Sequence, residues 1–183
     1  MMSVPLAPNP PVIGLACGIE RWFVKTLADG DAPLLNLTQV TRMSVRELNA
    51  LPVRCGGLPD RREVAEEFRT FETVGRVTYV AYQDDRDYHI VLEDPSAPGL
   101  TIVTELADTA CRGAVMSPHL ATLLTANASF RALVGSRVPS ALVGTTLRVQ
   151  GVGFYDFNHG QRGRSLNCLE LHPIVSIEQV PPS

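Results

Sequence analysis

The sequence predicts a mainly β protein built on a small five-stranded barrel with an N-terminal extension. Three observations point to this class. From about residue 70 onward, short runs rich in Val, Ile, Tyr and Phe recur between turn residues, which is the pattern of strands. One helical apolar stripe separates the third run from the fourth. With 45% hydrophobic and 19% charged residues, the chain has the composition of a globular protein that buries a core.

The N-terminal part of the chain predicts two segments ahead of the barrel. Residues 1–16 are rich in proline, and their Pro-Pro and Asn-Pro steps disfavour helix, so we expect an extended lead. Residues 17–62 form an extension that packs on the barrel. The lead has no basic residue before its short apolar run and therefore makes a poor signal peptide. No apolar stretch approaches the roughly 20 residues of a membrane helix.

Within the extension, the sequence predicts a strand, a short helix and an irregular connection. The aromatic and β-branched run over residues 20–27 is typical of a strand. Ser44 is a good N-cap and Glu47 occupies the capping-box position, so we expect a helix over residues 44–51. Residues 53–61 contain a Gly-Gly pair flanked by prolines, which predicts an irregular connection.

Residues 63–183 hold the barrel, in which five strands and one helix follow one another. The strand-like runs are separated by turns rich in Asp, Gly and Pro. Ser117 followed by a proline predicts a helix start, because a serine N-cap with proline at the first helical position is favourable. The predicted strands cover residues 73–82, 88–93, 100–106, 147–154 and 169–177, and the helix covers residues 117–133.

This order of elements, β-β-β-α-β-β, is that of the OB-fold, a five-stranded barrel with a helix between its third and fourth strands. OB-folds bind ligands through the loops between strands 1 and 2 and between strands 4 and 5. In this chain those loops are residues 83–87 and residues 155–168. Another small half-open barrel, or an α+β sheet with the helix on one face, fits the same order.

The segment from Gly151 to Pro173 concentrates polar, aromatic and basic side chains between two apolar strands. Its glycines, Gly151 and Gly153, predict a bulge or bend in the first of those strands. Its aromatic rings suit the stacking of bases or sugars and its arginines suit phosphates, although the rings also suit the filling of a barrel end. The expected binding residues are Tyr155, Phe157, Asn158, His159, Gln161, Arg162 and Arg164.

These features predict a non-catalytic binding or interaction module, whose ligand is a single-stranded nucleic acid or an oligosaccharide. The sequence contains no nucleophile elbow, phosphate loop or dinucleotide fingerprint, so no residue pattern identifies an enzyme. The net charge of −3 gives no electrostatic signal for double-stranded nucleic acid. The expected partner is therefore a polymer or a protein of unidentified kind.

Two other functions fit the sequence. Imidazoles and carboxylates together hold divalent metals that activate water, so His159 and His172 predict a metal-dependent phosphodiester hydrolase. Asp85 and Asp87 are the further candidate ligands. His89 belongs to the same set, although its place in an alternating strand predicts an exposed side chain. Alternatively, the chain is a structural subunit whose extended lead docks on a neighbouring copy to form an oligomer.

The charged residues Glu20, Arg21 and Lys25 surround Trp22. No nucleophile or base at a fixed spacing accompanies them. We therefore expect a structural ion pair with an aromatic anchor rather than a catalytic pair.

The four cysteines, Cys17, Cys55, Cys111 and Cys168, lie too far apart in the sequence for a zinc ribbon or finger. Two alternatives stay open from their spacing. They are buried free thiols, which behave as small hydrophobic side chains, or they form disulfides. Disulfides would place the protein outside the cytosol.

Segments across the chain resemble a group of uncharacterised bacterial proteins with OB-like barrels. They are CGIERWFVKT at 17–26, DYHIVLED at 87–94, and GVGFYDFNHGQRG at 151–163 with the ELHP that follows. The likeness implies a barrel but no activity or ligand. Because Cys17 and Cys111 lie in or beside matching segments, it also implies a disulfide between them and hence a secreted protein. The redox state of Cys55 and Cys168 stays open.

Overall fold

The computed structural model describes residues 17–56 and 58–181, so the expected lead over residues 1–16 lies outside it. The strands are β1 (Val40–Arg42), β2 (Thr70–Tyr82), β3 (Tyr88–Glu93), β4 (Thr101–Leu106), β5 (Thr146–Tyr155) and β6 (Leu169–Val180). The helices are α1 (Trp22–Lys25), α2 (Val45–Asn49), α3 (Arg112–Met116) and α4 (Leu120–Val134). Short 3-10 turns cover Ala32–Leu34, Ala65–Phe68 and Pro139–Leu142. Among these described residues, no helix has the length and apolar content to span a bilayer.

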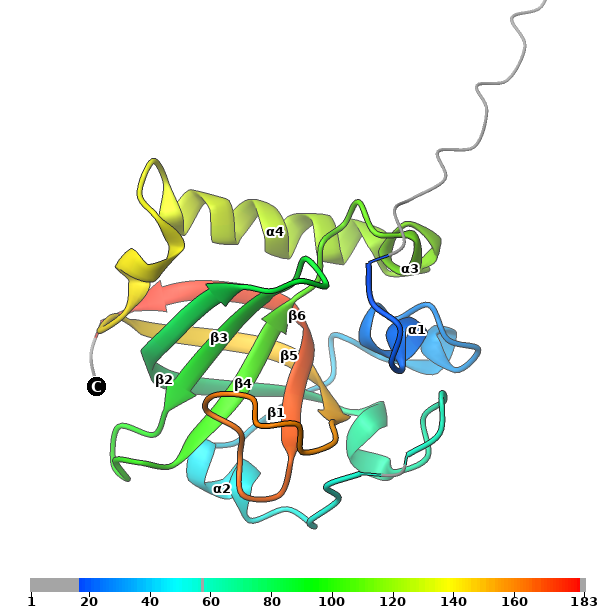
Figure 1. Ribbon diagram of the computed structural model, residues 1–183, viewed down its shortest axis with the longest axis horizontal. Helices are drawn as coiled ribbons and strands as arrows, with labels where there is room; N and C mark the ends of the chain where they lie inside the picture. The colour runs from blue at the N-terminus through cyan, green and yellow to red at the C-terminus, as the bar shows by residue number, and fades with distance from the viewer. Residues whose placement is uncertain (1–16, 57, 182–183) are drawn as a thin grey trace, which may run out of the picture.

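Five of the strands close into the predicted barrel (Figure 1). β2 pairs antiparallel with β3, and β3 pairs antiparallel with β4. β4 then pairs parallel with β6, β6 pairs antiparallel with β5, and β5 returns to β2 and closes the ring. The short β1 adds to β2 in parallel, outside the ring. The helix α4 lies between the third and fourth barrel strands in sequence, so the OB-fold order is confirmed.

The apolar core fills the barrel, and helices close its two ends (Figure 1). Ile90, Leu92 and Leu171 point inward from their strands and are fully buried. Phe130 of α4 and Leu48 of α2 belong to the same core cluster. The helix α2 begins with the predicted capping box. The Ser44 side chain accepts a hydrogen bond from the Glu47 backbone N–H, and the Glu47 side chain accepts one from the Ser44 backbone N–H.

The outer face of β3, β4 and β6 is polar yet buried. Because side chains alternate along a strand, residues next to the core positions point outward. This rule places His89, Glu105, Glu170 and His172 on the outer face. The 155–168 loop covers part of that face, and Gly163, at φ 80°, approaches the Val91 side chain so closely that a Cβ atom would contact it. The fold therefore hides charged side chains between the barrel and a loop.

The prediction of a strand over residues 20–27 is wrong. Residues 22–25 form the short helix α1, and Arg21 before it adopts a left-handed conformation with φ 46°. Trp22, Val24 and Leu27 are buried, although they pair with no strand among the described residues. The aromatic and β-branched run thus reflects burial against the barrel rather than sheet pairing.

Both cysteine pairs form disulfides in the structure. Cys17 bonds to Cys111 with a Cα–Cα separation of 5.7 Å, which confirms the pairing that the family resemblance implied. Cys55 bonds to Cys168 with a separation of 5.1 Å. The first bond ties the extension to the start of α3, and the second ties the 53–61 connection to the end of the 155–168 loop. The extension is thus fastened covalently to the barrel.

The glycines of β5 act as predicted, because the register of β5 against β6 shifts at Gly151 and Gly153. A Cβ atom on Gly153 would collide with the backbone carbonyl oxygen of Glu66. We expect Gly153→Ala to lower the free energy of unfolding by at least about 1–3 kcal/mol, since backbone cannot move aside cheaply. Urea denaturation measures this change. Gly30→Ala is the control, because its Cβ meets nothing within 4 Å, and a loss equal to that of Gly153→Ala would contradict the expectation.

Candidate functional site

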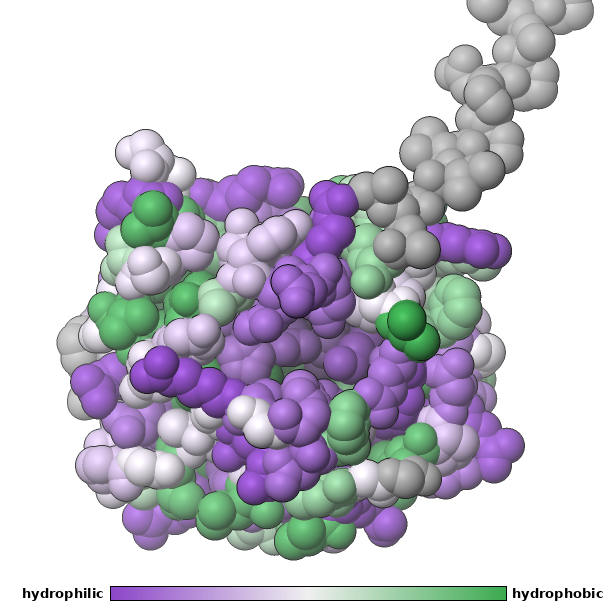
Figure 2. Space-filling model, viewed as in Figure 1, coloured by the Kyte–Doolittle hydropathy of each residue, from purple (hydrophilic) through white to green (hydrophobic). Residues whose placement is uncertain are grey.

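A polar cavity of about 480 Å³ lies over the outer face of β3, β4 and β6. The 83–87 loop, the 155–168 loop and Lys25 of α1 enclose it, so the two predicted binding loops do meet. Figure 2 shows this face of the molecule as hydrophilic and hollowed near its centre. The lining residues are Lys25, Tyr79, Gln83, Asp84, Asp85, His89, Glu105, Asp156, His159, Gly160, Gln161, Arg162 and Glu170.

His89 connects the barrel floor to the 155–168 loop. It lies opposite Glu105 in the antiparallel pairing of β3 and β4, and its Nδ1 is 2.8 Å from Glu105 Oε1. Its Nε2 is 2.8 Å from the backbone oxygen of Arg162. Because both partners are hydrogen-bond acceptors, both ring nitrogens carry protons. Burial opposes the charged ring, but Glu105 outweighs it and raises the pKa of His89. The expectation of an exposed His89 is wrong, since its exposed fraction is 4%.

His172 lies between two carboxylates and is fully buried. Its Nε2 is 3.1 Å from Asp87 Oδ2, and its Nδ1 is 2.8 Å from Glu105 Oε2. These are close charge contacts, but neither ring N–H makes an aligned hydrogen bond to any residue that the structure describes. Asp87 Oδ2 likewise lacks a hydrogen-bond partner within the described chain. The three side chains thus form a buried, tightly charged cluster below the cavity.

The pKa values of this cluster follow from burial and charge. Burial opposes the imidazolium of His172, but Glu105 and Asp87 outweigh it and raise its pKa to about 9. Burial also favours the neutral form of Glu105, yet His172 and His89 hold its pKa well below the usual range. For Asp87 burial dominates, and the pKa is raised. Glu105 is therefore the charged partner that the two imidazoles share.

A second charged group lies at the α1 side of the cavity. Lys25 Nζ is 3.6 Å from Asp156 Oδ2 and 5.2 Å from the centre of the Phe154 ring. Burial disfavours the ammonium of Lys25, but Asp156 and Glu105 outweigh it and raise its pKa. His159 Nε2 also approaches Asp156 Oδ2, at 3.4 Å. The acidic partner of Lys25 is therefore Asp156 of the 155–168 loop, so this ion pair joins the extension to the loop instead of lying within residues 20–25 as expected.

Glu170 is an acid in an acidic neighbourhood. Its side chain is 1% exposed, and its Oε2 has no hydrogen-bond partner in the described part of the chain. Its Oε1 receives a long hydrogen bond of 3.4 Å from Gln161. Burial, followed by the charges of Glu105 and Asp156, raises the pKa of Glu170 to about 8. Near pH 7 this carboxyl group is mostly protonated and offers the cavity a donor as well as an acceptor.

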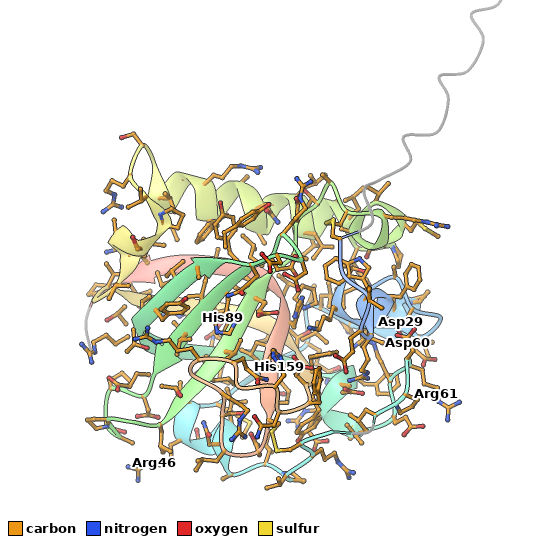
Figure 3. The ribbon with its side chains drawn as sticks, in the orientation of Figure 1. Asp29, Arg46, Asp60, Arg61, His89 and His159 are labelled. Carbon is orange, nitrogen blue, oxygen red and sulfur yellow. A yellow bond between two sulfur atoms is a disulfide. The ribbon has the colours of Figure 1, made fainter. Side chains whose placement is uncertain are left out.

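The structure separates the predicted binding residues into three groups. His159, Gln161 and Arg162 line the cavity, and the Arg162 guanidinium stacks 4.5 Å from the centre of the Tyr79 ring. Phe157 and Asn158 are exposed beside them at the tip of the loop. Figure 3 shows His159 and His89 on the same side of the barrel.

Tyr155 and Arg164 do not face the cavity. Tyr155 is 2% exposed, belongs to the core and donates its hydroxyl to the Pro52 carbonyl, so its assignment as a binding residue is corrected. Tyr155 is the last residue of β5, at a position whose side chain points into the barrel. Arg164 instead contacts the carbonyl of Ser165 and the sulfur of Cys168, next to the disulfide.

The predicted metal candidates also divide. His172 and Asp87 contact each other, whereas His159 and Asp85 line the cavity without joining them. Glu105 and Glu170 were missed by sequence reasoning, although each is a charged residue at an outward position of an otherwise apolar strand. A lone charged residue at an outward position of an apolar strand indicates that the outer face of that strand is covered. A face exposed to solvent would carry polar residues at most of its positions.

A larger and more open groove of about 1120 Å³ lies along β1, β2, β5 and β6. Its charged side chains already pair with each other, as Arg42 does with Glu72 and Arg148 does with Glu178. In these pairs the side chains of Arg42, Arg148 and Glu178 are 41–85% exposed, whereas that of Glu72 is 11% exposed. The smaller cavity is the stronger candidate, because its charged groups are buried at a cost that core packing does not explain.

Comparison with known proteins adds a distant likeness in shape. No protein-family model and no curated protein sequence matches the chain. A solved structure assigned as an aspartyl-tRNA synthetase from Leishmania major Friedlin aligns with a TM-score of 0.42 and 14% identity, over 78% of this chain. An asparaginyl-tRNA synthetase from Entamoeba histolytica aligns with a TM-score of 0.39 and 10% identity, over 70% of this chain. The chain spans only 21% and 24% of those two chains.

Proposed function

We propose that this chain is a binding module whose ligand is an oligosaccharide held in the cavity between the 83–87 and 155–168 loops. The observation that carries the proposal is the polar cavity itself, at the place where an OB-fold presents its ligand-binding loops. Its volume of about 480 Å³ falls within the range of about 300–1,000 Å³ typical of small-ligand sites.

The charges of the cavity favour a hydroxyl-rich ligand over a nucleic acid. Its carboxyl groups are Asp84, Asp85, Glu105, Asp156 and Glu170, whereas its permanent cations are Lys25 and Arg162. Carboxylates repel phosphates, and a protein that grips a phosphate backbone neutralises it with Lys and Arg. Sugar hydroxyls, in contrast, donate hydrogen bonds to carboxylates and accept them from a protonated carboxyl group or an amide.

Aromatic groups at the rim support the same ligand class. The Phe157 ring is 38% exposed at the tip of the loop and lies 4.7 Å from the His159 ring, centre to centre. An exposed ring beside a polar cavity provides an apolar face on which the C–H face of a sugar ring packs. Polar groups in the cavity then fix the orientation of the ligand.

A glycan array followed by calorimetry with the oligosaccharide that binds best tests this function. We expect Arg162→Ala and Gln161→Ala each to weaken binding by about tenfold or more, which corresponds to at least about 1.4 kcal/mol. The melting temperature of Arg162→Ala should stay close to that of the wild type, because its side chain is exposed. Arg46→Ala is the control, since Arg46 is exposed on α2, away from the cavity (Figure 3).

Single-stranded DNA and RNA oligonucleotides belong in the same screen. Binding of an oligonucleotide without binding of any glycan would overturn the oligosaccharide assignment. A folded chain that binds neither class would overturn the binding function. A glycan whose affinity falls equally in Arg46→Ala would place the ligand elsewhere on the barrel.

A further inference from the structure

We propose that His172 is a positioning residue for the cavity, because a buried row of side chains passes through its ring and joins the 83–87 loop to the 155–168 loop. The members of this buried row are, in order of contact, Asp87, His172, Glu105, His89 and the backbone oxygen of Arg162. Its two ends belong to the loops that enclose the cavity. The inference rests on the proposed function only for the purpose of that cavity, and the row itself is tested without a ligand.

His172 occupies the middle of the buried row and contacts an acid at each ring nitrogen. Its Nε2 is 3.1 Å from Asp87 Oδ2, and its Nδ1 is 2.8 Å from Glu105 Oε2. The two carboxyl groups therefore approach opposite sides of one ring. Only an imidazolium carries a proton on both nitrogens and can face two acceptors at once. The protonated ring thus attracts both acids, although neither contact has the alignment of a full hydrogen bond.

Glu105 continues the row to the 155–168 loop. One of its carboxylate oxygens faces His172, and the other is 2.8 Å from Nδ1 of His89. The opposite nitrogen of His89 donates to the backbone oxygen of Arg162, at 2.8 Å. The Arg162 guanidinium lies 4.5 Å from the centre of the Tyr79 ring, which in turn meets the His89 ring edge-on at 6.0 Å. Both the backbone and the side chain of this cavity residue are therefore held from the barrel.

Asp87 fixes the 83–87 loop at the other end of the row. Its backbone oxygen accepts a hydrogen bond of 2.9 Å from the backbone of Gln83, and its backbone N–H donates to Asp85 Oδ1 at 3.2 Å. Any movement of Asp87 therefore carries the whole loop with it. Asp87 and His172 are both fully buried and lie outside the wall of the cavity. They act on a ligand only through the loops that they hold.

Acids and imidazoles alternate along the row, so each buried charge faces an opposite one. Removal of one member leaves its neighbours unpaired in a buried place, and the four side chains therefore act as a unit. The other titratable groups that face the row are Lys25, Asp85, Asp156 and Glu170. Loops that are held in place before binding lose less conformational entropy when a ligand arrives. The row thus gives the cavity its shape in advance.

A pH titration of the isotopically labelled full chain, followed by nuclear magnetic resonance, tests the role of His172. Burial opposes its imidazolium, but Glu105 and Asp87 outweigh it and raise the pKa to about 9. The row is therefore complete below the ordinary histidine pKa of about 6.5 and is lost as the pH rises through the raised value. We expect the Cα signals of residues 83–87 and 160–163 to shift together with both ring nitrogens of His172.

The same titration of Glu170→Gln separates the two groups that titrate in this region, because the pKa of Glu170 is raised to about 8 by burial and by neighbouring acids. The joint shift of the two loops should remain in this variant. A His172 ring that titrates near about 6.5, or loop signals that do not follow the ring, would overturn the proposal.

The isosteric variant Asp87→Asn tests whether the row connects the loops. It should shift the Cα signals of residues 160–163, at the far end of the row, and this response should disappear when Glu105→Gln is already present. Asp108→Asn is the matched control, because it breaks only the 2.7 Å pair with Arg86 on the outside of the same loop. It should shift residues 83–87 alone. Circular dichroism verifies that each variant is folded.

Two results with these variants would contradict the role of the row. One is an Asp87→Asn chain whose 160–163 signals stay in place, and the other is an equal shift of those signals in Asp108→Asn. Both measurements use the chain without a ligand. The glycan array therefore decides the proposed function separately, and failure of one proposal is distinguishable from failure of the other.

Discussion

Replacing Arg21 by methionine is expected to lower the free energy of unfolding by about 3–5 kcal/mol, which is the cost of removing one partner of a buried ion pair. The Arg21 guanidinium binds both carboxylate oxygens of Glu67, at 2.7 and 3.0 Å. It also donates to the backbone oxygens of Pro59, Arg61 and Tyr155, so all five of its N–H groups are used. Glu67 is fully buried, and without Arg21 its charge would be left unpaired.

Urea denaturation, followed by the fluorescence of the single tryptophan, Trp22, measures this change. Arg61→Met is the control, because the side chain of Arg61 is 70% exposed in its pair with Glu63. A surface pair of this kind contributes about 0–1 kcal/mol. A loss below about 1 kcal/mol in Arg21→Met, or an equal loss in both variants, would show that the buried pair does not hold the extension to the barrel.

Removing the disulfide between Cys55 and Cys168 is expected to have an effect of similar size. The bond closes a loop of 113 residues, and chain entropy gives such a loop a stabilisation of about 4–5 kcal/mol. The double variant Cys55→Ser/Cys168→Ser should therefore unfold at a clearly lower urea concentration than the oxidised wild type. Peptide mapping without reductant reports the pairing in the wild type.

The single variants Cys55→Ser and Cys168→Ser provide the comparison, since each alone also breaks the bond. We expect both to lose about as much as the double variant. Free thiols at both positions in the mapped wild type, or a double variant that is as stable as the oxidised wild type, would contradict the expectation.

The barrel was predictable because its signals are local. The sequence predicted a strand over residues 88–93, and β3 has those bounds. The capping box of Ser44 and Glu47 was read from spacing alone, as was the bend at Gly151 and Gly153. Each of these features depends on neighbouring residues and on turn chemistry, which the sequence displays directly.

The candidate site was only partly predictable, because topology assembles it. The 83–87 and 155–168 loops meet as expected, but the buried acids that face them come from elsewhere. Glu105 meets His172 only because β4 and β6 pair in parallel, and nothing local in the sequence announces that pairing. Lys25 enters the cavity because residues 20–27 form a helical turn against the barrel instead of the expected strand.

Two of the four metal candidates from the sequence, Asp87 and His172, lie together, whereas His159 and Asp85 do not join them. Residue type identified the candidates, but only the strand order selects which of them converge. Tyr155 shows the same limit. It was expected to be a binding residue of the loop, but it occupies an inward-facing position of β5 and its ring lies in the core. Aromatic rings next to a barrel mouth fill cores as readily as they stack on ligands.

Amide chemical-shift mapping of the isotopically labelled chain, titrated with the bound oligosaccharide, tests the location of the site most directly. We expect the largest shifts at Asp84, Asp85, Glu105 and residues 156–162, which border the cavity between the two loops. Shifts gathered instead along the open groove of β1, β2, β5 and β6 would contradict the assignment of the cavity as the ligand-binding site.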